Sequence, residues 1–300
     1  MSEAPRLLIL DGGAGRELAR MGAPFRQPEW SALALLEGPE FVQHMHARFI
    51  TAGADIITTN SYAVVPFHLG EDRFAARGLE LAGLAGRLAR QASADAPRPV
   101  TVAGSLPPIG GSYRADLFDA DTARVVLQVL VQGLSPYVDQ WQAETLSLIA
   151  EAEVVRTVLG DDPRPLFLSF TLKDDQPDLA HPALRGGESV TAATQAAVRL
   201  GAAAILFNCS QPEVMEAAVQ AAADTLKGLH APLAIGVYAN AFPPQSEAAE
   251  ANATLCDIRQ DLTPQGYLAF AKSWRARGAT VIGGCCGIGP EHIAALRAAL

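Results

Sequence analysis

Short apolar runs alternate along this chain with longer stretches rich in alanine, leucine and arginine. Apolar runs bounded by Gly, Pro or polar residues predict buried strands, and the longer stretches predict helices. The expected strands are Leu7–Asp11, Asp55–Thr59, Pro99–Gly104, Val138–Glu144, Pro165–Leu172, Ala204–Asn208, Leu233–Tyr238 and Thr280–Gly284. The expected helices cover 40–52, 72–93, 121–134, 147–159, 189–200, 212–228, 264–277 and 291–299.

Residues at the ends of the predicted helices support this interpretation. Pro39 and Pro264 stand at early helix positions, where a missing N–H is tolerated, and Thr263 precedes the second of them as a cap. A glycine follows four of the helices, at the usual C-terminal stop: Gly53, Gly160, Gly201 and Gly278. Eight strand–helix units predict an α/β fold with a single (β/α)8 TIM barrel over residues 1–300, and a doubly wound sheet is the structural alternative.

Composition narrows the class of protein. The 300 residues are 49% hydrophobic and 18% charged, which is typical of a globular chain, and the formal net charge is −9. This acidic balance, without a basic stripe, argues against nucleic acid as a partner. No apolar run reaches the roughly 18–20 residues of a membrane span, and Leu7–Leu10 is too short for a signal-peptide core. We therefore expect a cytoplasmic protein with no membrane partner, and the sequence leaves a homo-oligomer open.

Residues capable of chemistry gather at the C-terminal ends of the predicted strands. They are Asp11-Gly12-Gly13, Thr58-Thr59-Asn60, Glu144, Asn208-Cys209-Ser210 and Gly283-Gly284-Cys285-Cys286-Gly287. The longest irregular segments, 105–120 and 239–263, follow the third and seventh strands and would lie on the same face. Active sites of (β/α)8 barrels lie on that face, so the distribution of polar residues predicts an enzyme.

Three of the four cysteines occupy two of these strand ends. Cys209 and the pair Cys285-Cys286 would be neighbours at the barrel mouth, and the flanking glycines allow the sharp turn that adjacent ligands of one ion need. Three thiolates with an open fourth position suit a catalytic zinc ion. A buried apolar Cys209 beside an accidental or redox-active pair explains the same spacing, so the spacing leaves both interpretations open. Cys256 ends no predicted strand and is interpreted as an uninvolved thiol.

At these residues the sequence resembles the homocysteine S-methyltransferase family, zinc-thiolate barrels that include betaine-dependent and S-methylmethionine-dependent enzymes. The matching motifs extend over essentially the whole chain: Asp11–Leu18, Trp30-Ser31-Ala32, Ala52–Tyr62, Ala143-Glu144-Thr145, Asn208-Cys209-Ser210 and Gly283–Gly287. The Gly-Gly-Cys-Cys-Gly element, combined with an upstream Asn-Cys and an N-terminal Asp-Gly-Gly, is highly specific. The resemblance therefore favours the zinc interpretation of the cysteines.

The resemblance also implies a role for each matching residue. It implies a Zn2+ site at the C-terminal face of the barrel, with the ligands Cys209, Cys285 and Cys286. Asp11 and Glu144 match acidic residues that hold the amino-acid part of homocysteine. Asn60 matches a polar position that lines the same pocket.

The reaction implied is transfer of a methyl group from a small donor to the homocysteine thiolate, which gives methionine. The loops Ser105–Arg114 and Tyr238–Phe242 depart from the family pattern, and they would shape the donor side of the site. We expect no betaine-type C-terminal extension and no cobalamin or folate module, since none is recognisable in these 300 residues, and this favours a sulfonium donor, S-methylmethionine or S-adenosylmethionine. Betaine or another donor, or another thiol or selenol acceptor, is the alternative.

Each substrate-binding candidate also has a structural alternative. Asp11 could cap the helix that follows Gly12-Gly13, Glu144 could be an ion-pair partner at the barrel mouth, and Asn60 could form an Asx turn. Tyr113 is a candidate for the donor pocket, whereas Trp141 is expected to pack in the core.

Three other functions fit parts of the sequence. Lys173 could form a Schiff base in aldolase-like chemistry, although Asp174-Asp175, expected in a solvated loop, disfavour the neutral amine that this chemistry needs. The Gly-rich turn after the eighth strand could cradle a phosphate group. A non-catalytic zinc- or thiol-binding barrel, controlled by a Cys285–Cys286 disulfide, would use the same cysteines.

Overall fold

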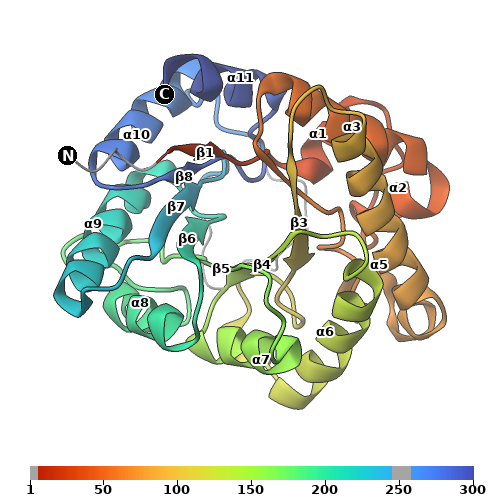
Figure 1. Cartoon of the computed structure of the whole chain (residues 1–300), viewed down its shortest axis with the longest axis horizontal. Coiled ribbons are helices and arrows are strands. Elements are labelled where there is room, and N and C mark those ends of the chain that lie inside the picture. Colours follow the sequence, from red (N-terminus) through yellow and green to blue (C-terminus); the bar gives the residue numbers. More distant parts are fainter. Residues whose placement is uncertain (1–5, 245–257) are drawn as a thin grey trace.

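The computed structural model describes residues 6–244 and 258–300. Within these ranges, eight parallel strands form one sheet in the order β1-β8-β7-β6-β5-β4-β3-β2, and a bridge between Leu10 and Ile56 joins its two edges. The strands are β1 Leu8–Ile9, β2 Ile56–Thr58, β3 Thr101–Leu106, β4 Gln140–Leu146, β5 Leu166–Phe170, β6 Ala204–Asn208, β7 Ala234–Tyr238 and β8 Val281–Ile282. Figure 1 shows the strands in a central ring with helices around it. The predicted (β/α)8 barrel is confirmed.

A long helix follows each strand, within two residues of its predicted bounds. These helices are α3 Pro39–Ala52, α5 Glu71–Ala94, α6 Ala120–Leu134, α7 Ile149–Leu159, α8 Val190–Arg199, α9 Pro212–Leu229, α10 Pro264–Ala276 and α11 Pro290–Ala299. Among the described residues, no helix has the length and apolar character that crossing a membrane requires.

The expected helices of the sequence do not include the short helices in the loops, although the capping alternative for Asp11 assumes a helix after Gly12-Gly13. They are α1 Ala14–Arg20, α2 Ala32–Glu37, α4 Pro66–Leu69 and the 3-10 turn η1 Ala115–Leu117. These helices lie in the loops after β1, β2 and β3. A helix of one or two turns contains too few residues to show a hydrophobic period, which is why the pattern did not reveal them.

Polar caps and glycines fix the ends of the long helices. The Asp119 side chain accepts a hydrogen bond from the backbone N–H of Thr122 at 2.8 Å, and the Thr263 hydroxyl accepts one from Gly266 at 3.2 Å. Such bonds satisfy N–H groups that have no partner inside the first helical turn. At the other end of α3, Gly53 adopts the left-handed conformation with φ +112°, as its position after the helix predicted.

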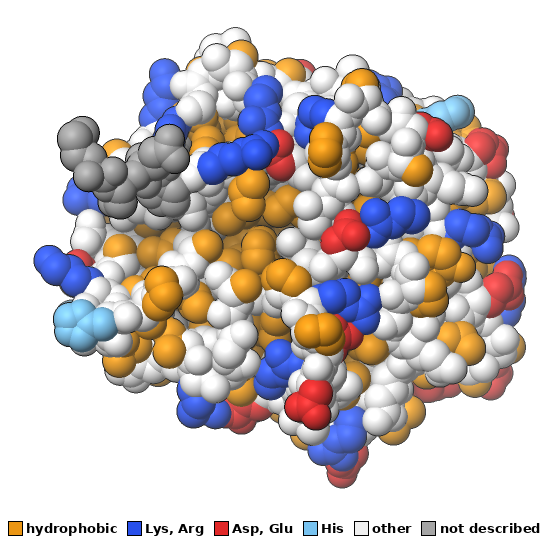
Figure 2. Space-filling model, in the orientation of Figure 1, with side chains coloured by type: hydrophobic (Ala, Val, Ile, Leu, Met, Phe, Trp, Pro, Cys, Tyr) orange, Lys and Arg blue, Asp and Glu red, His pale blue; other side chains and the backbone are white. Residues whose placement is uncertain are grey.

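The apolar core has two parts, one inside the barrel and one between the barrel and its helices. The inner cluster consists of residues on or beside the strands: Leu10, Ile56, Ala103, Phe167, Ala204, Leu206, Tyr238 and Val281. The larger cluster joins the outer faces of the strands to the helices. Figure 2 shows apolar side chains gathered in a hollow near the middle of one face, with charged side chains around it. Because side chains fill the interior of the barrel, we expect a functional site at the ends of the strands.

Candidate active site

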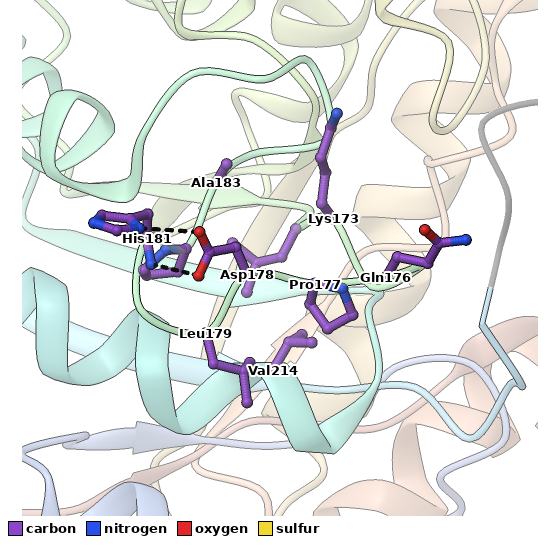
Figure 3. Close-up of a pocket in the computed structure, with 10 residues that line it drawn as sticks. Lys173, Gln176, Pro177, Asp178, Leu179, His181, Ala183 and Val214 are labelled. Carbon is purple, nitrogen blue, oxygen red and sulfur yellow. Dashed lines mark hydrogen bonds and ion pairs between the residues drawn. The ribbon is translucent and has the colours of Figure 1, made fainter.

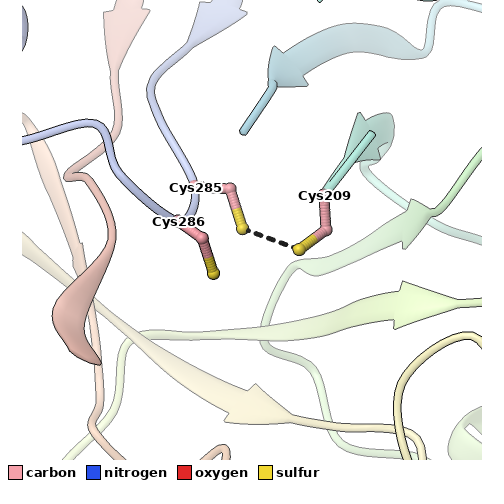
Figure 4. Close-up of side chains that lie close together, drawn as sticks. All are labelled: Cys209, Cys285 and Cys286. Carbon is pink, nitrogen blue, oxygen red and sulfur yellow. Dashed lines mark hydrogen bonds between the residues drawn. The ribbon is translucent and has the colours of Figure 1, made fainter. Parts of the chain in front are cut away.

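Three cysteine side chains meet at the carboxyl ends of β6 and β8 (Figure 4). Cys209 directly follows β6, Cys285 and Cys286 stand in the turn after β8, and only β7 lies between these two strands in the sheet. The Sγ atoms of Cys209 and Cys285 are 3.1 Å apart, and all three Sγ atoms lie within 4.8 Å of one another. The structure thus brings together the three cysteines of the sequence prediction. Cys256 lies outside the described residues.

Glycines let the turn after β8 pass close to neighbouring groups. A Cβ added to Gly283 would lie 2.4 Å from the Cβ of Leu10, and one added to Gly284 would lie 2.2 Å from Cγ2 of Ile288. Gly287 has φ +84°, in the left-handed region that glycine adopts readily. The sequence Gly-Gly-Cys-Cys-Gly is therefore the local reason why two adjacent thiols can face the sulfur beside β6.

Three backbone N–H groups of this turn are already bonded. Those of Gly283, Gly284 and Cys285 donate to carbonyl oxygens of the neighbouring chain segments at 3.0, 2.9 and 2.9 Å. A phosphate cradle requires N–H groups that point at the anion. These three N–H groups already donate to carbonyl oxygens at the ends of neighbouring strands, so they are not available to a phosphate group, which argues against the phosphate alternative.

Electrostatics of the sulfur cluster favour a bound cation. Hydrogen bonds from Cys285 and Cys286 lower the pKa of Cys209, and the contact with Cys209 raises the pKa values of Cys285 and Cys286. The three thiols therefore concentrate negative charge on Cys209, and a divalent cation would allow all three to ionise. Sulfurs held about 2.3 Å from one ion at tetrahedral angles lie about 3.8 Å apart. The cluster fits a metal ion by both geometry and ligand chemistry.

Asp11 lies just after β1 and is 7% exposed. One carboxylate oxygen accepts a hydrogen bond from the backbone N–H of Thr58 at 2.7 Å, and the other accepts one from the Thr58 hydroxyl at 3.1 Å. Burial raises the pKa of Asp11 to about 7, although the bonds from Thr58 oppose this shift. The next helix, α1, has Gly13 as its N-cap residue and no side-chain cap bond, so the capping alternative for Asp11 is wrong.

Glu144 on β4 is surrounded by hydroxyl groups. One of its oxygens accepts a short hydrogen bond from Ser105, and the Tyr238 hydroxyl lies 3.5 Å from the other. Burial raises the pKa of Glu144 to about 8, and the charges of Asp11 and Cys209 act in the same direction. Its hydrogen-bond partners among the described residues are hydroxyls and not cations, so the ion-pair alternative is wrong.

Asn60 is buried at the end of β2, with 2% of its surface exposed. Its side-chain nitrogen donates a hydrogen bond to the carbonyl oxygen of Ser31 at 3.0 Å. This bond ties the end of β2 to the segment that leads into α2. A role for Asn60 in substrate binding stays a prediction.

The two aromatic residues singled out in the sequence have different positions. Trp141 on β4 is fully buried, and the guanidinium of Arg164 lies 4.7 Å from the centre of its ring, so its expected packing role is confirmed. Tyr113, in the loop after β3, reaches the cysteine cluster. Its hydroxyl lies 3.1 Å from both Sγ and the carbonyl oxygen of Cys209. No motif in the sequence indicates that contact, because the two residues are 96 positions apart.

The expectation that Asp174-Asp175 forms a solvated loop is wrong for Asp174. That side chain is buried, and its carboxylate forms an ion pair with the guanidinium of Arg185 at 2.7 Å. Both residues come from the loop between β5 and α8. The negative charge of Asp174, which the sequence led us to expect in solvent, is therefore neutralised by a cation of the same loop. Asp175 itself is exposed.

Lys173, the candidate for aldolase-like chemistry, lines a separate pocket of about 140 Å3. The pocket is formed by residues of the loop 172–183 and by Val214 of α9 (Figure 3). Its lining includes the exposed pair His181–Asp178, with a distance of 2.9 Å, and Figure 3 shows the Lys173 side chain extending away from that pair. Cys209, Cys285 and Cys286, the cysteines that the structure describes, do not line this pocket.

Comparison with known proteins identifies relatives along almost the entire chain. A homocysteine S-methyltransferase from Escherichia coli is 32% identical over 97% of this chain and 94% of its own length. A selenocysteine methyltransferase from Astragalus bisulcatus is 25% identical over 98% of this chain and 92% of its own length. The crystal structure of the E. coli homocysteine methyltransferase MmuM in its metallated form superposes with a TM-score of 0.78 at 28% identity, covering 97% of this chain and 96% of that one. A sequence model described as homocysteine S-methyltransferase matches residues 8–300, and the chain belongs to that family.

Proposed function

We propose that the protein uses zinc to transfer a methyl group from a sulfonium donor, S-methylmethionine or S-adenosylmethionine, to homocysteine. The observation that carries this proposal is the cluster of three sulfurs within 4.8 Å of one another, in the same barrel mouth as the buried carboxyl group of Asp11 and the half-buried one of Glu144. A substrate that carries both a thiol and an ammonium group suits this arrangement, because the thiol matches the metal held by the cysteines and the ammonium matches the carboxyl groups.

Cys209, Cys285 and Cys286 would hold the metal, and an all-thiolate set favours zinc over the harder cations magnesium, calcium and manganese. A zinc ion bound there would accept the homocysteine sulfur as a fourth ligand and favour its thiolate form at neutral pH, where a free thiol is mostly protonated.

Asp11 and Glu144 would bind the substrate ammonium. Their pKa values of about 7 and about 8 show that burial disfavours two unpaired negative charges at this place. A substrate cation would compensate for that cost and favour the ionised carboxylates. Thr58 and Ser105 hold the two carboxyl groups in position by hydrogen bonds.

The negative charge of the site favours a cationic methyl donor. Three cysteinates and a substrate thiolate carry four negative charges against the two positive charges of a zinc ion, so a sulfonium group is attracted. In the transfer, the homocysteine sulfur forms a bond to the methyl carbon while the bond from that carbon to the sulfonium sulfur breaks. The electron pair of the broken bond stays with the donor, which leaves as a neutral thioether. No side chain has to supply a proton for this step.

The identity of the methyl acceptor is a separate part of the proposal. The similarity to a selenocysteine methyltransferase makes selenocysteine the second candidate acceptor. A selenol would occupy the same position as the homocysteine thiol, so the cysteine cluster alone does not separate them.

The test is a panel of donors and acceptors with reduced, zinc-loaded protein. We expect about one zinc per chain, and methionine formation from homocysteine with S-methylmethionine or S-adenosylmethionine but not with betaine or methyltetrahydrofolate. Faster product formation with selenocysteine than with homocysteine would reassign the acceptor. Protein that retains no zinc under reducing conditions and binds no homocysteine would overturn the proposal.

A further inference from the structure

One of the three sulfurs differs from the other two in its surroundings. The Tyr113 hydroxyl donates a hydrogen bond to Sγ of Cys209, with an O–S distance of 3.1 Å, and lies equally close to the carbonyl oxygen of Cys209. Among the described residues, Cys285 and Cys286 receive no hydrogen bond from a hydroxyl group. The Tyr113 contact therefore singles out Cys209.

The loop that carries Tyr113 is fixed on its other side. The Tyr62 hydroxyl, from the end of β2, lies 2.5 Å from the hydroxyl of Ser112, the residue before Tyr113. Tyr113 itself has φ +68°, an unfavourable backbone conformation for a residue with a side chain, and Gly111 before it has φ +103°. Strained backbone of this kind persists only where the surrounding contacts hold it.

The ring of Tyr113 is held by a buried cation. The guanidinium of Arg185 lies 4.3 Å from the ring centre, and Arg185 is in turn fixed by its 2.7 Å ion pair with Asp174. The second oxygen of Asp174 accepts a hydrogen bond from the backbone N–H of Gln211 at 3.2 Å. Gln211 follows Cys209 by two positions, so these contacts form a closed chain from Cys209 through Tyr113, Arg185 and Asp174 back to the segment after Cys209.

Cys209 also has an unusual backbone. Its φ of +52° lies in the left-handed region, and its carbonyl oxygen is 3.4 Å from the Thr171 hydroxyl as well as close to Tyr113. This backbone conformation directs the Cys209 side chain toward the other two sulfurs. The Tyr113 hydroxyl helps to stabilise it through its contact with the Cys209 carbonyl oxygen.

We propose that Tyr113 is a positioning residue for the metal ligands, which holds the Cys209 sulfur and withdraws charge from it through a hydrogen bond. The inference rests on the proposed function, because it assigns a consequence to this bond when a metal is held by the three cysteines. A thiolate that accepts a hydrogen bond donates less charge to a metal, and groups that orient ligands in this way typically change metal affinity about 10- to 100-fold when they are removed. Arg185 acts one step further out, by keeping the ring in place.

The test compares Tyr113→Phe with Tyr62→Phe in the reduced full-length protein. Each variant loses one hydroxyl group near the same loop, but only the first loses a hydrogen bond to sulfur. The readouts are the near-ultraviolet charge-transfer band of the cobalt(II)-substituted protein and zinc affinity measured by competition with a chelator. We expect Tyr113→Phe to move the band to longer wavelength, because sulfur electrons without the hydrogen bond are more easily transferred to the metal. Zinc should bind about 10-fold more weakly, whereas Tyr62→Phe, which keeps the hydrogen bond to sulfur, should shift the band less.

A band and an affinity equal to wild type in Tyr113→Phe would overturn the inference, as would equal band shifts in both variants, which would point to displacement of the loop. If Tyr113→Phe does not fold, 3-fluorotyrosine in place of Tyr113 serves instead. Its more acidic hydroxyl donates a stronger hydrogen bond, so the band should move to shorter wavelength, and an unchanged or opposite shift would contradict the inference. A wild-type protein that binds neither cobalt nor zinc would overturn the proposed function as well, whereas a normal wild-type site with an unaffected variant would overturn only the role of Tyr113.

Discussion

Arg185 and Asp174 form an ion pair with an N–O distance of 2.7 Å, in which the two side chains are only 3% and 0% exposed. The pair lies within the loop between β5 and α8, and Asp174 also accepts a hydrogen bond from the backbone at the start of α9. The loop is therefore attached to the barrel mouth by a charge interaction that solvent does not reach. The same guanidinium packs on the ring of Tyr113.

Loss of one partner of this pair should destabilise the fold strongly. Asp174→Ala leaves the guanidinium of Arg185 buried without its carboxylate, and removing one member of a buried pair typically costs about 3–5 kcal/mol. We expect the free energy of unfolding to fall by about that amount. Urea denaturation followed by circular dichroism measures it.

The matched control is Asp178→Ala in the same loop. Asp178 pairs with His181 at 2.9 Å, but the side chains of His181 and Asp178 are 85% and 64% exposed. Its loss should change the free energy of unfolding by less than about 0.5 kcal/mol. Equal losses in the two variants would show that the burial of the Asp174 pair has no energetic consequence.

The sequence allowed the barrel to be predicted because its signals are local. A strand of a parallel barrel is buried on both faces and appears as a short apolar run, and Pro39 and Gly53 mark the two ends of a helix wherever they occur. The pair Asp174-Asp175 shows the limit of such signals. Two adjacent acidic residues indicate a solvated loop unless a cation is supplied from elsewhere, and Arg185 is eleven positions away.

Substitution of one metal ligand should abolish the metal site. Cys209→Ser replaces a thiolate by a hydroxyl group that stays protonated at neutral pH and is a poor zinc ligand. We expect less than one tenth of the wild-type zinc content after dialysis and at least about a 100-fold loss of methionine formation. Elemental analysis and a methionine assay measure the two effects.

Cys256→Ser is the control for that experiment, since the sequence analysis predicts that Cys256 takes no part in metal binding. The variant should keep both zinc and activity. A loss of zinc in Cys256→Ser comparable to that in Cys209→Ser would show that the ligand set has been assigned wrongly.

Recognition of the substrate ammonium should depend on Glu144. Glu144→Gln keeps the shape of the side chain but removes its charge, and a hydrogen bond to a charged group contributes about 1.5–3 kcal/mol. We expect kcat/KM for homocysteine to fall about 10- to 100-fold. Steady-state kinetics with a fixed, saturating methyl donor give this ratio.

A substrate without the amino group separates ammonium binding from other effects of the variant. With 4-mercaptobutyrate, which keeps the thiol and the carboxylate, wild type and Glu144→Gln should differ by less than about threefold. If the variant is impaired equally with both acceptors, Glu144 acts on the sulfur chemistry and not on the ammonium group.

The site was harder to predict than the fold, because its contacts join distant parts of the chain. The resemblance to a family named Asp11, Glu144 and the cysteines, but the bond from Tyr113 to Cys209 joins residues 96 positions apart and has no motif. Asn60 shows the same limit. The resemblance implies a role for its side chain in substrate binding, which stays a prediction, and no motif indicated the bond from its amide nitrogen to the carbonyl oxygen of Ser31.

The two raised carboxyl pKa values should appear in the stability of the metal-free protein. The ordinary pKa of Glu144 is 4.5, and in the folded protein burial raises it to about 8. Between these values the folded protein holds a proton that the unfolded chain has lost, so stability falls as the pH rises. Glu144→Gln removes this proton uptake. The variant should therefore gain at least about 1 kcal/mol relative to wild type between about pH 5 and about pH 8, measured by urea denaturation with chelator and reductant.

Glu80→Gln provides the comparison for that titration. Glu80 is exposed on α5, and a hydrogen bond from Arg77 holds its pKa below the usual value, so it is ionised in the folded and unfolded states throughout this range. Its effect on stability should not vary with pH. If the difference in unfolding free energy between wild type and Glu144→Gln is also independent of pH, Glu144 is already ionised in the folded protein before substrate binds. The ammonium group would then bind to a preformed charge, without release of a proton from Glu144.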